Sequence, residues 1–151
     1  MIGWLTDIDD ANEYFDEKRL ETAEWDKLSS ADKEKAAWNA YNRIANSSDF
    51  SIPASPSATE LAKLKEAQCE MSYYLAVHLA SEDKRKGLQA QGVVEAGIVQ
   101  ETYDKDSLAK LPIPPTVFEI LGDFYKYGEA FGIVDVDRDE DESVDTKVDE
   151  F

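Results

Sequence analysis

The chain has 151 residues, of which 42% are hydrophobic, so it is long enough for one domain with a packed core and does not have the composition of a disordered protein. Its 33 acidic residues against 16 basic ones give a net charge of -17, which disfavours a groove that binds nucleic-acid phosphates, although such a charge equally serves solubility. The sequence has no stretch near the roughly 18 consecutive apolar residues of a membrane span, no signal-peptide pattern, and a single cysteine, Cys69, so we expect no membrane, no intrachain disulfide and a reducing cytoplasm.

Two helices are predicted in the first third of the chain. Asp9 and Asp10 are placed to cap a helix of about ten residues, and a connector that carries Trp25 and Leu28 follows. A serine cap at Ser29 and Ser30 then precedes apolar residues at helical spacing. The second helix is therefore predicted over about residues 30–46, with its apolar side formed by Ala36, Ala37, Ala40, Tyr41 and Ile44.

A proline-containing loop over 46–57 separates these helices from a third, longer one. Ser57 and Glu60 have the spacing of a capping box, and the cationic run before Gly87 is typical of a helix end, which predicts a helix over about 58–83. One side of this helix is marked by residues that recur at steps of three and four, and they are Leu61, Leu64, Gln68, Met71, Leu75 and His78. On this pattern His78 is expected in the core rather than in a nucleophilic pair, and Cys69 is expected to be a small structural hydrophobe.

The residues after Gly87 change in character and favour strands. Val93 and Val94, then Ile98, Val99 and Tyr103, alternate with glycines, which predicts a β-hairpin at about 88–103 that turns near Ala96-Gly97. A two-stranded hairpin alone is marginal in water, so it must either lie on the helices or be completed by another chain.

A fourth helix is predicted over about 115–130, after Pro112, Pro114 and Pro115. Its broad apolar surface either fills the core or meets a partner. Residues 133–151 then contain nine acidic residues against Arg138 and Lys147, which predicts an acidic extended tail. The fold class expected is mainly α: a small bundle of about four helices, with the hairpin between the third and fourth, a domain over 1–132 and a tail over 133–151.

Motifs that carry chemistry are missing from this sequence. It has no G-x-x-x-x-G-K and no G-x-G-x-x-G. Asp135-x-Asp137-x-Asp139 resembles the start of a calcium loop, but Glu140 replaces the glycine and Thr146 stands where the bidentate glutamate belongs. We therefore predict no catalytic, cofactor-binding or metal-binding residue, and a protein that is not an enzyme.

The order of the segments resembles the head-tail adaptor, or head-completion (connector), proteins of tailed bacteriophages, some of which are labelled DnaT-like single-stranded DNA-binding proteins. The likeness covers roughly residues 6–130, and the tail is longer and more acidic than the family pattern. The segments that carry it are Asp9-Asp10-Ala11-Asn12-Glu13-Tyr14-Phe15, Trp25, Leu28-Ser29-Ser30-Ala31-Asp32-Lys33-Glu34, the alanine-rich helix through Arg43, Leu64-Lys65-Glu66-Ala67-Gln68-Cys69-Glu70-Met71, the hairpin, Leu111-Pro112 and an apolar last helix.

The resemblance implies a structural virion protein made in the host cytoplasm that forms a ring, twelvefold in this reading, beneath the portal. Its expected partners are the portal, neighbouring copies, tail or neck proteins, and genome DNA that passes through the lumen without sequence-specific binding. An acidic wall repels phosphate, and a hairpin that needs completion can pair with a neighbour. The expected interface residues are Val93, Val94, Ile98, Val99, Tyr103, Phe131 and Phe151.

Two other functions fit parts of the sequence. An acidic cytoplasmic regulator that mimics DNA would use the same negative charge, but as a monomer or dimer. A single-stranded DNA binder would stack bases on Trp25, Trp38 or the tyrosines beside a basic groove. The basic cluster Lys84-Arg85-Lys86 is more economically explained as a helix C-terminus, so the adaptor is the preferred prediction.

Overall fold

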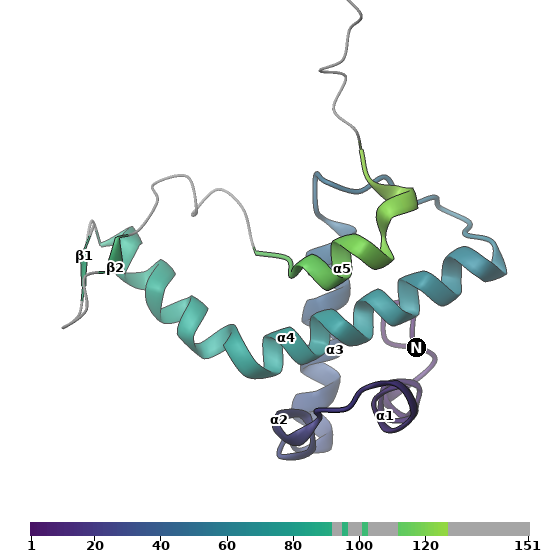
Figure 1. The fold of residues 1–151 in the computed structure, drawn as a ribbon, viewed down its shortest axis with the longest axis horizontal. Coiled ribbons are helices and arrows are strands. Elements are labelled where there is room, and N and C mark those ends of the chain that lie inside the picture. Colours follow the sequence, from purple (N-terminus) through teal and green to yellow (C-terminus); the bar gives the residue numbers. More distant parts are fainter. Residues whose placement is uncertain (92–94, 97–100, 103–111, 127–151) are drawn as a thin grey trace, which may run out of the picture.

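The computed structural model describes residues 1–91, 95–96, 101–102 and 112–126, and within them the chain is mainly helical, as predicted (Figure 1). The boundary expected at residue 132 and the acidic tail lie outside the described residues. The elements in chain order are α1 (Ile8–Lys18), α2 (Ala23–Asp26), α3 (Ser30–Ala45), α4 (Ala58–Ala90), β1 (Glu95–Ala96), β2 (Glu101–Thr102), α5 (Pro115–Ile120) and a 3-10 turn (Gly122–Phe124).

Helices α3 and α4 begin at the serine caps that the sequence predicts. The Ser29 hydroxyl accepts from the Asp32 amide at the start of α3. At the start of α4 the Ser57 amide donates to Glu60 at 2.7 Å while the Glu60 amide donates to the Ser57 hydroxyl, so the predicted capping box is confirmed. For α1 the prediction was wrong by two residues, because Asp7 is the cap and its carboxylate accepts from the amides that follow.

Among the described residues, two buried clusters hold the helices together, and α4 contributes to both. One lies among α3, α4 and α5, and the other lies among α1, α2, α3 and α4. The short helix α2 was expected only as a connector, and it buries Trp25 in the second cluster. In Figure 1, α4 runs through the centre of the molecule with α5 along one side and α1 and α2 together on another.

The N-terminal turn docks on α3 and α4. Ile2 and Leu5 pair through their backbones and bury their side chains, while Gly3 between them has φ +64°. A Cβ on Gly3 would lie 2.5 Å from the Tyr41 ring, so both the backbone angle and the close approach require glycine here. The buried Gln68 side chain completes the joint, as it accepts from the Trp4 amide and donates to the carbonyls of Ile2 and Ala37.

α4 does not end at the cationic run, which corrects the predicted boundary at residue 83. The helix continues through Gly87 to Ala90, so residues 88–90, expected in a strand, are helical. Gly87 has no positive φ, and a Cβ there would meet nothing within 4 Å. The glycine therefore does not act as a left-handed cap, and the helix-forming residues after it continue the helix.

The two short strands pair antiparallel, with Glu95 opposite Thr102 and Ala96 opposite Glu101. Ala96 lies in β1, and the rest of the turn predicted near Ala96-Gly97 lies outside the described residues. The rest of the predicted hairpin, including its apolar residues, lies outside the described residues.

α5 is much shorter than the predicted helix over 115–130. Pro115 occupies its first turn as expected, but the helix ends at Ile120 and a 3-10 turn leads into extended chain. Phe50 and Tyr125 form an isolated antiparallel bridge, the Ser51 amide donates to the Phe124 carbonyl at 2.7 Å, and the Lys126 amide donates to the Asp49 carbonyl at 2.8 Å. Tyr125 and Lys126 therefore pair with a distant loop instead of continuing the predicted helix, and residues 127–130 lie outside the described residues.

Candidate functional site

All seven predicted interface residues lie outside the described residues. They are Val93, Val94, Ile98, Val99, Tyr103, Phe131 and Phe151. The functional features that the structure does describe lie where the last part of α4 leaves the helical body, and we call α4 residues 77–90 the α4 arm.

The α4 arm is little covered by the described part of the body. Buried side chains line α4 from Leu64 to Leu75, whereas in the arm Glu82 is the buried residue among those described. Val77 and His78 are exposed, and the His78 ring lies 4.9 Å from the Tyr74 ring. The prediction of a core histidine was therefore wrong, because the cover over α4 ends near Leu75 while the helical spacing continues.

An ion pair anchors the α4 arm to the body. Arg43 of α3 donates from Nη1 to Glu82 Oε2 at 3.0 Å and to the Pro112 carbonyl at 3.3 Å. Both charged side chains are only 9% exposed. Lys86 Nζ lies 3.7 Å from Glu82 Oε1, an oxygen that has no hydrogen-bond partner among the described residues. Arg43 thus links α3, α4 and the segment before α5.

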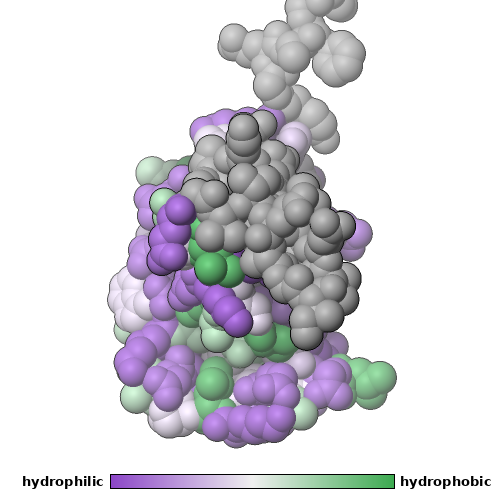
Figure 2. Space-filling view, turned by 90° about the vertical axis from the view of Figure 1, so that its left-hand side faces the viewer, coloured by the Kyte–Doolittle hydropathy of each residue, from purple (hydrophilic) through white to green (hydrophobic). Residues whose placement is uncertain are grey.

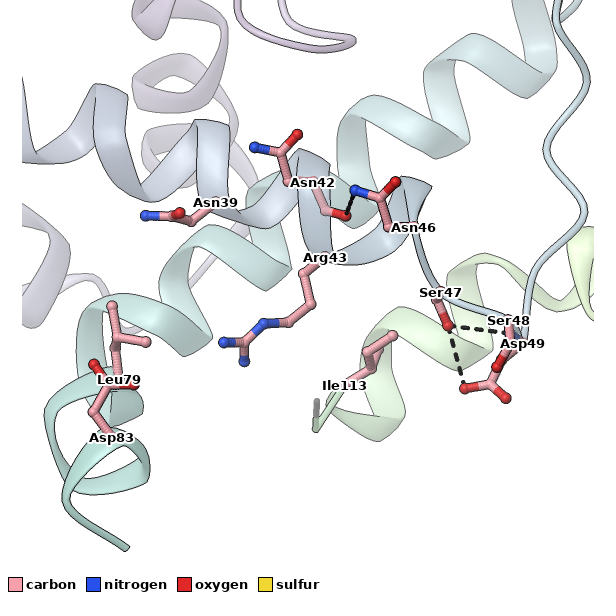
Figure 3. A pocket seen from close by; sticks show the side chains of 10 residues that line it. All are labelled: Asn39, Asn42, Arg43, Asn46, Ser47, Ser48, Asp49, Leu79, Asp83 and Ile113. Carbon is pink, nitrogen blue, oxygen red and sulfur yellow. Dashed lines mark hydrogen bonds between the residues drawn. The ribbon is translucent and has the colours of Figure 1, made fainter. Parts of the chain in front are cut away.

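An open cavity of about 650 Å³ lies beside this ion pair, and its walls come from α3, the loop after α3, the α4 arm and the segment before α5 (Figure 3). Polar side chains dominate the lining, and Leu79 and Ile113 supply the apolar part. Asn39, Asn42 and Asn46 recur at steps of three and four residues, so they share one side of α3. The described residues that line it are Asn39, Asn42, Arg43, Asn46, Ser47, Ser48, Asp49, Leu79, Asp83 and Ile113.

The residues proposed for base stacking divide into two cases. Trp25 is 1% exposed, with its Nε1 donating to Asn12 Oδ1, so it cannot stack on a nucleic-acid base. Trp38 is 45% exposed and packs edge-on against Tyr41.

The cationic cluster Lys84-Arg85-Lys86 lies inside α4 rather than at its end, so its explanation as a helix C-terminus was wrong. Its member Lys86 is directed to Glu82.

Cys69 is 1% exposed, which confirms its expected place in the core. Burial raises the pKa of its thiol to about 12, and the neighbouring Glu70 carboxylate adds to the shift. The thiol therefore stays protonated near neutral pH and is a poor nucleophile.

Within the described residues no group of three His, Cys, Asp or Glu side chains is placed to hold a metal ion. The calcium-like motif at Asp135 lies outside these residues. No helix in the described part of the chain has the length and apolar character needed to cross a membrane.

No family model matches the chain, and no curated protein or solved structure matches it either.

Sequence reasoning missed several side chains that connect distant segments. Arg43, Glu82 and Gln68 have partners 31 to 69 residues away, and sequence spacing carries no signal for such pairs. The asparagines of α3 did have a signal, since their spacing alone places them on one side of a helix.

Proposed function

We propose that this chain is a structural assembly protein of the phage head-tail adaptor class, which forms a ring beneath the portal and extends the DNA channel. The observation that carries the proposal is the projecting α4 arm. α4 has 33 residues, about 50 Å at 1.5 Å per residue, and its packed part ends well before its last residue.

The β1–β2 pair lies at the far end of the α4 arm, away from the helical body (Figure 1). A two-stranded pair is marginal in water unless something else covers or extends it. An arm that carries such a pair is well placed to reach a neighbouring subunit, and the expected interface residues of this segment are Val93, Val94, Ile98, Val99 and Tyr103.

The charge of the chain supports the rest of the proposal. Viewed toward the end where the arm projects, hydrophilic residues cover most of the coloured surface and apolar ones form small separate areas (Figure 2). With a net charge of -17, a ring of such subunits would repel DNA phosphates and let the genome slide without sticking. In this proposal the protein resides in the virion neck, contacts portal, tail or neck proteins and copies of itself, and carries out no catalysis.

Light scattering tests the proposal. The purified protein is measured alone and then with the portal protein encoded beside it, at low and at moderate salt. A ring, or a complex of fixed stoichiometry with the portal, is the expected result. A monomer that ignores the portal under both salt conditions would overturn it.

The same net charge favours a second candidate, an acidic regulator that mimics DNA. Such a mimic acts as a monomer or dimer and binds a basic DNA-binding enzyme, so the oligomeric state separates the two proposals. A single-stranded DNA binder receives less support, because burial of Trp25 removes one of its stacking platforms.

A further inference from the structure

We propose that the cavity between α3 and the α4 arm binds an extended peptide segment of a partner protein, holding it by its backbone. The inference goes beyond the assembly role, because it assigns a peptide-binding site to residues outside the hairpin and the tail. The volume of about 650 Å³ lies within the roughly 300–1,000 Å³ of ordinary ligand sites.

The asparagine row supplies the backbone recognition. A carboxamide has both a donor and an acceptor, as a peptide group does. From Asn39 to Asn46 the helix rises by about 10 Å, which is close to the length of three extended residues. The side chains of Asn39 and Asn42 make no hydrogen bond to another described residue, whereas Asn46 Nδ2 donates to the Asn42 carbonyl at 2.8 Å (Figure 3).

Arg43, which lines the same cavity, adds hydrogen-bond donors whose positions are fixed. Its side chain is nine-tenths buried and held by the Glu82 carboxylate and the Pro112 carbonyl, both of which bond to Nη1. Nε and Nη2 have no hydrogen-bond partner among the described residues and are left to donate to a peptide carbonyl. Because the guanidinium is already oriented, little conformational entropy is lost when a peptide binds.

Charge and apolar lining define the peptide. Among the described residues that line the cavity, Asp83 supplies a carboxylate, and the cationic side chain, that of Arg43, is paired with Glu82. An occupant with lysine or arginine is therefore favoured over an acidic one. Leu79 and Ile113 offer contact to one apolar side chain. The peptide that we expect to bind is therefore extended and basic, with one aliphatic residue between its basic residues.

The experiment uses the full chain and a fluorescein-labelled heptapeptide with leucine at its centre, lysine at its second and sixth positions and glycine elsewhere. Fluorescence anisotropy should show saturable binding. The double variant Asn39→Ala, Asn42→Ala should bind at least about tenfold more weakly, which corresponds to ~1.4 kcal/mol. Glu34→Gln, on the same helix but outside the cavity, should bind like the wild type, and circular dichroism confirms that each variant is folded.

A second peptide with the same side chains but N-methylated central amides separates backbone recognition from charge attraction. It should lose most of the affinity. Equal binding of the two peptides, equal binding by the double variant, or no saturation up to about 1 mM would each overturn the proposal. Preference for a peptide with glutamates in place of the lysines would also overturn it and assign the cavity to an acidic segment such as residues 133–151. Dimerisation of the free protein that the double variant abolishes would assign it to a second copy.

Discussion

At the scale of single residues, the fold depends on polar side chains that lie deep in the body. Gln68 is fully buried and satisfies three backbone groups, two of them in the N-terminal turn and one in α3. A buried backbone group without a partner is costly, whereas a matched polar contact adds only modest stability. Replacing such a residue therefore destabilises the fold mainly because it leaves buried backbone groups without hydrogen-bond partners.

Gln68→Leu should lower the free energy of unfolding by about 3 kcal/mol, because the Trp4 amide and the carbonyls of Ile2 and Ala37 lose their partner while the volume is conserved. Urea denaturation followed by circular dichroism measures the change. Gln91→Leu makes the same chemical change at an exposed position and should alter stability by no more than about 0.5 kcal/mol. Equal effects of the two substitutions would contradict this role for Gln68.

The Asp10 carboxyl makes the stability of the fold depend on pH. A hydrogen bond from Lys65 Nζ at 2.8 Å, then one from the Thr6 amide, hold the pKa of the Asp10 carboxyl below its ordinary value. A carboxyl whose pKa is lower in the folded state stabilises the fold above its unfolded pKa, and that contribution is lost as the pH falls through the folded pKa.

Asp10→Asn should therefore cost about 0.5–1 kcal/mol at pH 7, a small value because the pair is about a third exposed. The difference from the wild type should shrink below pH 4. It should vanish once Asp10 of the wild type is protonated in both the folded and the unfolded state. Urea denaturation at pH 7, 4 and 2.5 measures it. A difference that does not change with pH would show that the charge of Asp10 is not what stabilises the fold.

At the scale of elements, the sequence predicted those features that depend on neighbouring residues. The caps at Ser29 and Ser57 were predicted because each bonds within three residues. The ends of α4 and α5 were not predicted, since a glycine such as Gly87 indicates a helix end only when its φ is positive, and the bridge from Phe50 to Tyr125 joins residues far apart in the sequence. The cavity could not be predicted for the same reason, because four separate segments form its walls.

Gly87→Ala tests the length of α4. In an exposed helical position without a positive φ, alanine should stabilise the protein by about 0.5–1 kcal/mol. Thermal unfolding measures the change. If Gly87 were a left-handed cap, the substitution would destabilise instead. Gly3→Ala is the matched opposite, and it should destabilise by about 2 kcal/mol because φ is +64° and the Tyr41 ring is too close.

The ion pair that anchors the α4 arm can be tested by a double-mutant cycle. Arg43→Met leaves the Glu82 carboxylate buried without its main partner and should cost about 3 kcal/mol. Adding Glu82→Leu should recover most of that loss, since a buried pair and an apolar pair of similar volume are often equally stable. Additive losses in urea denaturation would show that the two side chains do not act together.

At the scale of the whole molecule, charge acts against compactness. A net charge of -17 on 151 residues makes the folded chain repel itself, and the ion pairs on its surface offset little of this. The midpoint of thermal unfolding should therefore rise as sodium chloride is raised from about 10 to 300 mM, because the screening length falls from roughly 30 Å to under 8 Å. A midpoint that falls with salt would mean that attractive pairs dominate.

Because α4 is continuous, its length also sets the direction in which the far end of the α4 arm faces. Each residue inserted between Ser81 and Gly87 would move the far end outward by about 1.5 Å and rotate it by about 100°. Two inserted residues would turn the far end nearly to the opposite direction, whereas seven would restore its original facing about 10 Å further out. The length of the α4 arm can therefore change without rotating its far end only by whole helical turns, and this holds for any partner that the arm contacts.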